Sequence, residues 1–332
     1  MRKNLLCFIL LLSSLAALAQ DPTPPAGMQG LELRTWLLQN WYNPYHNTLG
    51  YTPAREIMYG TIDNTAGQIY CVYTGFYQPA SFTSFPDPIN TEHTVPQSWF
   101  NSMEPMRSDI HHIFPTHMDV NNARGSLPFG EVIDSQTDDW FIGNGSGITV
   151  TSSIPTSNID DYSEVYSNNH FEPKEATKGN TARAIFYFYT MYPNQAGDIS
   201  LLANINTLYQ WHLDDPVDAM EINRDNLVQQ YQGNYNPYIH SPELLPLAWG
   251  FTTSLSEQKT LDFTLFPIPT HDCLSIQVQS SILQAHAYNL IGEAQELRIE
   301  AGSIDISFLS PGVYSLLLST EEGVGVRRFV VE

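Results

Sequence analysis

The chain has 332 residues, of which 42% are hydrophobic and 15% are charged, so its composition is that of a globular protein long enough for two domains. Its 14 Lys and Arg residues face 35 Asp and Glu residues, and the formal charge of -21 excludes a polycation that holds nucleic acid or an anionic membrane by bulk charge. Three cysteines exclude a disulfide scaffold.

Residues 1–19 have the pattern of a secretory signal peptide. Arg2 and Lys3 form a positive start, residues 5–15 are apolar, and Ala17-Leu18-Ala19 fits a small-x-small cleavage site. The apolar stretch is too short for a comfortable membrane span, and no later segment is long and apolar enough. We therefore expect an exported protein, extracellular or at the cell surface, with no membrane span.

The composition changes near Trp249, which predicts two domains. Residues 20–250 are rich in Asn, Tyr, Trp and Pro, whereas residues 261–332 show short alternating apolar runs between Pro and Gly. The second pattern predicts a small all-β sandwich, and residues 251–260 are the expected linker. Because Cys71 and Cys273 fall in different domains, we expect two buried free thiols rather than a disulfide.

The first domain is predicted to be mainly helical with a short β element, so the fold class of the whole chain is α+β. Apolar residues at helical spacing predict helices over residues 31–41, 181–192, 199–212 and 216–232. Residues 69–76 alternate as a strand, and the polar residues 160–169 are expected to form a surface loop.

Residues suited to metal-assisted hydrolysis gather in the stretches 91–99 and 108–125. Glu92 and His93 would point to opposite faces of a regular strand, but a turn there would let both flank one reaction centre. Asn121 lies 28 residues beyond His93. A carboxylate with an amide oxygen suits Mg²⁺ and is poor for Zn²⁺, which leaves the imidazole free to act as a general base. Together these groups suit water attack on a phosphodiester.

These stretches resemble those of the bacterial extracellular endonuclease I family, a branch of the His-Me finger (ββα-metal) nucleases. The resemblance covers roughly residues 30–245 and consists of several separate motifs in the same order. The matching text is Glu92-His93-x-x-Pro96, Ser108-Asp109-Ile110-His111, Val120-Asn121 with Arg124, Glu172-Pro173 with Lys178-Gly179-Asn180-x-Ala182-Arg183, Trp211-His212-Leu213-x-Asp215-Pro216-Val217, Glu221, Arg224-Asp225-Asn226, and Gln232-Gly233-Asn234-Tyr235-Asn236-Pro237.

The resemblance implies a secreted, non-specific endonuclease that cuts DNA, and often RNA, to 5′-phosphate products from a mainly helical domain around a ββα-metal motif. His93 would be the general base, and Glu92 and Asn121 would hold one Mg²⁺, with Mn²⁺ or Ca²⁺ as alternative ions. Some relatives carry a Cys-bridged insertion with a phosphate-binding arginine, which residues 97–107 here are too short to contain. The remaining expected site residues are Arg124 and Arg183 as catalytic, Arg107 and Lys178 as substrate-binding, and Asp109 and His111 as supporting residues.

Several of these residues have structural alternatives. Asn121 could cap a helix, Arg183 could pair with Glu172, and His111 could be a hydrogen-bonded scaffold residue that positions the metal helix. Residues 20–250 contain 8 Lys and Arg against 25 Asp and Glu. We therefore expect the basic residues of the motif region to gather around the metal groove, with the acidic residues on the opposite faces; these basic residues are Arg107, Arg124, Lys174, Lys178 and Arg183.

The C-terminal residues resemble the β-sandwich sorting domain of type IX secretion, which implies the secretion machinery as a partner. The motifs are Phe266-Pro267-Ile268-Pro269, Tyr288-Asn289-Leu290-Ile291-Gly292, Ile304-Asp305-Ile306, Leu309-Ser310-Pro311-Gly312-Val313-Tyr314, and Arg327-Arg328-Phe329-Val330. The alternative for this domain is an Ig-like accessory module that binds polysaccharide or cell wall.

Two other functions compete with the nuclease for the whole chain, which we expect to be a monomer. A non-catalytic surface protein could use the same groove to bind extracellular DNA, but it would not need Glu92, His93 and Asn121 together. A zinc protease is disfavoured because the sequence contains no His-Glu-x-x-His motif.

Overall fold

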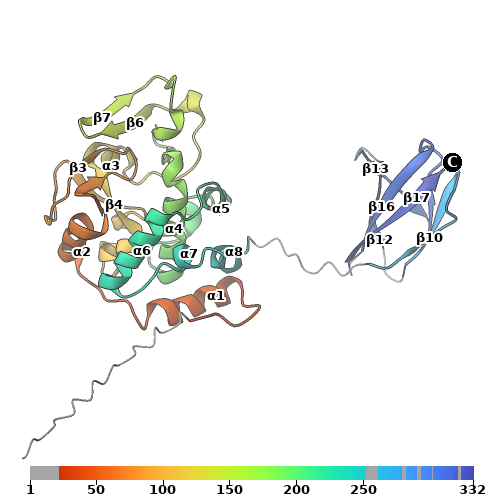
Figure 1. The fold of residues 1–332 in the computed structure, drawn as a ribbon, viewed down its shortest axis with the longest axis horizontal. Coiled ribbons are helices and arrows are strands. Elements are labelled where there is room, and N and C mark those ends of the chain that lie inside the picture. Colours follow the sequence, from red (N-terminus) through yellow and green to blue (C-terminus); the bar gives the residue numbers. More distant parts are fainter. Residues whose placement is uncertain (1–21, 252–260, 279–281, 290–292, 301, 321–322) are drawn as a thin grey trace, which may run out of the picture. The chain divides into compact units, whose positions relative to one another are not determined.

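The computed structural model describes residues 22–251, 261–278, 282–289, 293–300, 302–320 and 323–332, and it forms two units, Met1–Phe251 and Thr252–Glu332 (Figure 1). The predicted signal peptide, residues 1–19, lies outside the described residues, as does the predicted linker from residue 252 onward. In the part of the chain that is described, no helix is long and apolar enough to cross a membrane.

Eight α-helices are described in the first unit, and α4 is its central element (Figure 1). All side chains of α4 except Asn180 are buried, because its apolar and aromatic residues surround the whole helix axis. The helices are α1 (Gly30–Leu37), α2 (Tyr51–Ile57), α3 (Met118–Arg124), α4 (Lys178–Met191), α5 (Ile205–Asp214), α6 (Ala219–Gln232), α7 (Pro237–His240) and α8 (Leu244–Trp249).

Short helical turns of three to five residues lie between or directly after the longer elements. They are η1 (Leu38–Tyr42), η2 (Met58–Ile62), η3 (Gln97–Phe100), η4 (Met106–Ser108), η5 (Ile110–His112), η6 (Asp134–Gln136), η7 (Ile159–Asp161), η8 (Glu175–Thr177) and η9 (Ile199–Leu201).

The predicted helices occur, but their ends differ from the predicted ends. The helix expected at residue 181 already begins at Lys178, where the Asp215 carboxylate accepts the free N–H of Gly179. A Cβ at Gly179 would lie 1.9 Å from the Asp215 carbonyl oxygen, so this close approach requires glycine. The helix expected at residue 199 begins only at Ile205, because the Asn204 side chain caps it there.

Two sheets in the first unit depart from the predicted strands. The strand expected over residues 69–76 ends at Tyr70, because Cys71 donates to the Phe76 carbonyl and closes a turn between the strands Gln68–Tyr70 and Tyr77–Pro79. The surface loop expected over residues 160–169 was wrong: strand β8 lies there, and its Val165 is in the core. One sheet has the order β1 (Asn64–Thr65), β2 (Gln68–Tyr70), β3 (Tyr77–Pro79), and the other β7 (Gly147–Thr151), β6 (Asp139–Asn144), β8 (Ser163–Tyr166), β9 (His170–Glu172).

A separate two-stranded antiparallel sheet joins β4 (Ile89–His93) to β5 (Ile113–His117), with Glu92 opposite Phe114 and His93 opposite Ile113. Helix α3 begins at the residue after β5. The chain therefore passes from strand to strand to helix at the position of the predicted metal residues.

The described residues of the second unit form two four-stranded antiparallel sheets, whose side chains share one core that includes Leu274, Leu316 and Phe329. The whole chain is thus an α+β fold with a β-rich C-terminal region, as predicted. Cys71 and Cys273 are both free, but the burial expected for Cys273 was wrong, because this first residue of the strand Cys273–Gln277 is exposed. The strands are β10 (Thr264–Phe266), β11 (Cys273–Gln277), β12 (Ile282–Tyr288), β13 (Ala294–Glu296), β14 (Ile299–Glu300), β15 (Ser303–Asp305), β16 (Gly312–Thr320) and β17 (Gly323–Val331).

Candidate active site

Glu92 is a buried carboxylate with one oxygen held in place. Its side chain is 1% exposed; its Oε1 accepts a 2.8 Å hydrogen bond from the Tyr73 hydroxyl and lies 3.5 Å from Nη1 of Arg124. Burial raises the pKa of Glu92, and Arg124 and Tyr73 counter only part of that rise. Among the described residues, no hydrogen bond occupies Oε2, so this oxygen is the one left for a cation.

His93 is the last residue of strand β4, and the tautomer of its ring is defined by one hydrogen bond. Its Nε2 lies 3.1 Å from the carbonyl oxygen of Arg107, and since a carbonyl only accepts, Nε2 carries the proton and Nδ1 carries the lone pair. Burial, together with the nearby His112, lowers the pKa of His93 well below its usual range. The imidazole is therefore neutral near pH 7, with Nδ1 able to accept a proton.

Helix α3 holds Asn121 against the backbone of β4. The Asn121 amide nitrogen donates to Asn90 Oδ1 at 2.7 Å and to the carbonyl of Thr91 at 3.2 Å. Because the nitrogen is used by both bonds, the amide orientation is defined, and Oδ1 has no hydrogen-bond partner in the described part of the chain. The carbonyl that Asn121 contacts belongs to the residue immediately before Glu92.

Arg124 links Glu92 to the backbone of His93. Its side chain is buried, and its terminal nitrogens donate to the carbonyls of His93 at 3.3 Å and Thr94 at 2.8 Å. Its guanidinium carbon also lies 4.5 Å from the Phe129 ring centroid. Arg124 therefore contacts both Glu92 and the backbone of His93 from the buried interior.

Arg107 lies beside His93 and carries no ion pair among the described residues. Its Nε donates to Gln97 Oε1 at 3.1 Å, and its guanidinium carbon lies 4.2 Å from the ring centroid of Tyr51. The Tyr51 and His93 ring centroids are 5.6 Å apart. Arg107 is only partly buried, so it combines exposure with proximity to the imidazole.

Glu92 and Asn121 are a suitable pair for one hard divalent cation. They offer a carboxylate oxygen, Oε2 of Glu92, and an amide oxygen, Oδ1 of Asn121, and neither accepts a hydrogen bond within the described residues. Within the described ranges, no three His, Cys, Asp or Glu side chains converge as a metal cluster. A cation at this pair would therefore retain several water ligands, which is usual for Mg²⁺.

Asp109 and His111 lie in a buried polar network next to this site. Asp109 caps η5 through the N–H of His111, and its other oxygen accepts hydrogen bonds from Tyr187 and Tyr192 at 2.8 and 2.7 Å. Burial alone would raise the pKa of Asp109, but the surrounding imidazoles and the Tyr192 hydroxyl lower it overall.

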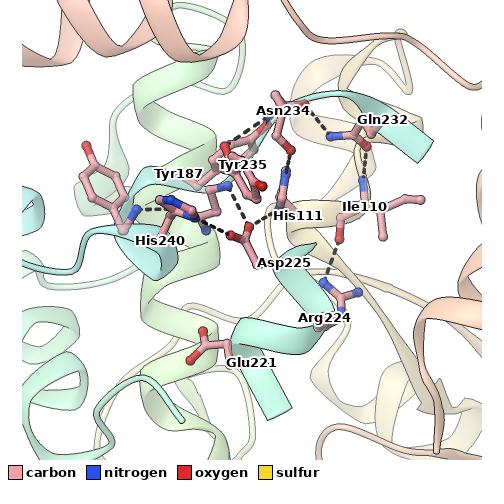
Figure 2. Close-up of polar contacts among 12 residues, drawn as sticks. Ile110, His111, Tyr187, Glu221, Arg224, Asp225, Gln232, Asn234, Tyr235 and His240 are labelled. Atoms are coloured by element: carbon pink, nitrogen blue, oxygen red, sulfur yellow. Dashed lines mark hydrogen bonds and ion pairs between the residues drawn. The ribbon is translucent and has the colours of Figure 1, made fainter. Parts of the chain in front are cut away.

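Figure 2 shows His111 between Asn234 and Asp225. Its Nε2 donates to the Asn234 carbonyl at 2.9 Å, and its Nδ1 is 3.6 Å from Asp225 Oδ1. Burial lowers the pKa of His111 to about 4, so it is neutral at pH 7. His111 thus joins η5 to α6 and to the segment that follows α6.

The structure does not bring Lys178 and Arg183 to Glu92 and His93. Arg183 forms a buried two-bond ion pair with Glu221, at 2.8 and 2.6 Å, rather than with Glu172. Lys178 Nζ is within 3.1 Å of the carboxylates of Glu131, Glu172 and Glu175. Both side chains are neutralised in separate clusters, so the expected gathering of all five basic residues does not occur.

Comparisons with known proteins agree with these motifs. The model of the Endonuclease I family matches residues 49–243. The chain belongs to the Endonuclease I family. A secretion system C-terminal sorting domain matches residues 264–332, so this Endonuclease I family member is secreted or at the cell surface.

Two curated proteins are similar to this family member. An extracellular ribonuclease of Bacillus subtilis (strain 168) is 28% identical over 176 residues, which cover 48% of this chain and 54% of that protein. An extracellular ribonuclease of Bacillus amyloliquefaciens is also 28% identical over 176 residues, covering 48% and 53%. The chain spans about half the length of these relatives.

Three residues around the site were not identified from the sequence. Tyr73 holds Glu92, the Tyr51 ring lies beside that of His93, and Arg55 packs on the Tyr51 ring. Tyr73 lies 19 residues before Glu92 and Tyr51 lies 42 before His93. No spacing rule connects residues so far apart, and the only sequence signal was the high tyrosine content.

Proposed function

We propose that this chain is a secreted, divalent-metal-dependent endonuclease that hydrolyses the phosphodiester bonds of DNA and RNA and leaves 5′-phosphate ends. The observation that carries the proposal is the pairing of a neutral, tautomer-defined His93 with the anchored carboxylate of Glu92. The succession β4, β5, α3 further supports a His-Me finger (ββα-metal) site. The names of the two relatives support RNA as a second substrate.

His93 is the proposed general base. Its Nδ1 takes a proton from water, the oxygen of that water attacks phosphorus, and the bond to the 3′ oxygen breaks, which leaves the phosphate on the 5′ side. The carbonyl of Arg107 holds the ring in the orientation and tautomer that this transfer requires. Arg107 itself is the proposed phosphate contact, because its guanidinium is partly exposed and has no acidic partner among the described side chains.

Glu92 and Asn121 are the proposed ligands of one Mg²⁺, with Mn²⁺ or Ca²⁺ as alternative ions. When bound, the cation would supply positive charge for the phosphate oxygens and for the departing 3′ oxygen. Tyr73 and Arg124 both contact Oε1 of Glu92 and so fix the orientation of its carboxylate. We therefore assign Arg124 a positioning role. We assign Arg183 and Lys178 structural roles because their charges are satisfied by carboxylates.

A plasmid-nicking assay tests the activity most directly. The full chain should nick supercoiled DNA and degrade a labelled RNA in Mg²⁺, EDTA should stop both reactions, and added Mg²⁺ should restore them. The products should carry 5′-phosphate, so a ligase should reseal nicked plasmid without prior kinase treatment. A chain that binds DNA in Mg²⁺ but never nicks it would instead be the non-catalytic DNA-binding protein.

A further inference from the structure

Two arginines, neither of which has an acidic partner among the described residues, lie against one tyrosine beside the proposed base. The guanidinium carbons of Arg55 and Arg107 are 3.9 and 4.2 Å from the ring centroid of Tyr51, which is 5.6 Å from that of His93. No ion pair to Arg55 or Arg107 occurs within the described residues. In a domain with 8 basic and 25 acidic residues over 20–250, these two unneutralised charges form a local positive site.

Arg55 is the central member of a longer stack. Its side chain is only 4% exposed, its Nε donates to the Tyr51 carbonyl at 3.3 Å, and its guanidinium carbon is 4.1 Å from the Phe85 ring centroid. The four residues Arg107, Tyr51, Arg55 and Phe85 therefore form one column of alternating guanidinium and aromatic groups. It runs from the neighbourhood of His93 to the surface.

The outer end of the column presents two exposed phenylalanines. Phe85 is 67% exposed, and Phe82, in the same segment between β3 and β4, is 71% exposed. Phe82 rests on the backbone of Gly60, where an added Cβ would lie 2.2 Å from its ring. The Phe85 ring thus packs on Arg55 and the Phe82 ring packs on Gly60, while much of the surface of both rings remains exposed to solvent.

We propose that the column and Phe82 form a subsite for unpaired nucleotides next to the scissile phosphate. Arg107 lies nearest the proposed base and would contact phosphate, while Phe85 and Phe82 would stack on bases. Exposed aromatic rings beside arginines bind single strands because every base has a face to stack, whereas bases in a duplex are already stacked. The inference rests on the proposed function and extends it to a preference for single-stranded DNA or RNA.

Binding measurements on the full-length His93→Ala chain test the subsite without cleavage. A labelled oligothymidylate and a labelled hairpin duplex would be titrated in Mg²⁺ and followed by fluorescence anisotropy. Phe85→Ala should weaken single-strand binding by about fivefold to 150-fold, the equivalent of about 1–3 kcal/mol for one stacked base, and should leave duplex binding nearly unchanged. Phe85→Trp should retain the affinity, and Phe82→Ala should act like Phe85→Ala.

Phe308→Ala is the matched control, because Phe308 is 54% exposed but belongs to the second unit. It should leave both affinities unchanged. The subsite would be refuted if a variant lost as much affinity for duplex as for single strand. It would also be refuted if Phe82→Ala and Phe85→Ala both kept the parent affinity for single strand. Nicking by the chain with His93 intact is measured separately: its absence would refute the proposed function, while a selective loss of single-strand binding would still establish the subsite.

Discussion

At the scale of single residues, His93 combines two properties that a general base needs. Its proton is fixed on Nε2 by the Arg107 carbonyl, and its ring is kept neutral by burial. We predict that His93→Ala lowers the turnover number by about 10² to 10⁴, the usual contribution of a general base, while DNA binding is retained. Single-turnover cleavage and anisotropy measure the two quantities, and near-normal cleavage by the variant would refute the assignment.

Tyr73 is a single residue that is proposed to act on the metal site through its hydrogen bond to Glu92. Removing its hydroxyl frees Oε1 of a buried carboxylate and should loosen the side chain that is proposed to bind the cation. We predict that Tyr73→Phe weakens Mg²⁺ affinity by about 10- to 100-fold, the usual effect of losing a hydrogen bond to a metal ligand, and that excess Mg²⁺ restores most of the rate.

Calorimetric titration of Mg²⁺ measures the affinity directly. Glu92→Gln and Asn121→Ala should weaken it more than Tyr73→Phe does. Tyr238→Phe is a suitable control, since the buried hydroxyl of Tyr238 bonds to Thr190 and Trp249 and to neither Glu92 nor Asn121. Unchanged affinity in both ligand variants would place the cation elsewhere.

His111 provides a pH-dependent contribution to stability. Its pKa is lowered to about 4 in the folded chain, against about 6.5 unfolded, so only the unfolded chain takes up this proton between those values. The contribution of neutral His111 is therefore complete above about pH 6.5 and is lost as the pH falls toward 4.

We predict that the stability cost of His111→Asn shrinks by up to about 3 kcal/mol between pH 7 and pH 4, because only the parent chain suffers this loss. Urea unfolding of both chains across this range gives the difference directly. Comparing the two chains removes the opposing effect of Glu164 and Glu172, whose pKa values burial raises to about 7. A constant difference would show that folding does not lower the pKa of His111.

At the scale of elements, the Arg183–Glu221 ion pair joins α4 to α6 in the interior. Removing one partner leaves an uncompensated buried charge, so we predict that Arg183→Met or Glu221→Gln each destabilises the first unit by about 3–5 kcal/mol. The double variant Arg183→Met, Glu221→Met should lose less than either single variant.

Urea unfolding measures these losses, and cleavage per folded molecule distinguishes structure from catalysis. Variants that remain folded should cleave at nearly the parent rate. A folded Arg183→Met chain whose turnover falls by orders of magnitude would show that Arg183 contacts the substrate after all.

At the scale of the whole molecule, charge governs the response to salt. The region 20–250 has 8 basic and 25 acidic residues, and several of its cations are neutralised internally, including Lys178, Arg183 and Arg224. A protein with few phosphate contacts loses affinity only slowly as salt is added. In a plot of log affinity against log salt concentration, each phosphate contact on duplex DNA contributes a slope of about -0.9. Salt also screens the long-range repulsion between this region and DNA.

Because the two effects oppose each other, we predict that activity holds or peaks at moderate salt instead of falling from the lowest concentration. Cleavage rate and duplex affinity measured over a salt series check this. A steep, monotonic slope like that of a protein with six to ten phosphate contacts would contradict the charge distribution described here.

The amino-acid sequence by itself determined the features that depend on local patterns. The many apolar and aromatic residues over 181–192 were enough to predict α4, and alternating residues beyond 261 were enough to predict the β-rich second unit. The order of motifs identified the family, and the adjacency of Glu92 and His93 together with Asn121 supplied the candidate site. The prediction of a surface loop at 160–169 failed because the three buried residues of β8 are Ser163, Glu164 and Val165, and only Val165 is apolar.

Only the tertiary structure decided which charged groups are available. Arg183 and Lys178 looked like site residues in the motifs, but Glu221 and Glu131, from segments 38 and 47 residues away, neutralise them. Likewise, Tyr73 reaches Glu92 and Arg55 reaches Phe85 only through the fold. The physical reason is that an ion pair, a hydrogen bond or a ring contact forms between atoms a few ångströms apart in space, and the local periodicity of a sequence does not specify which distant residues meet.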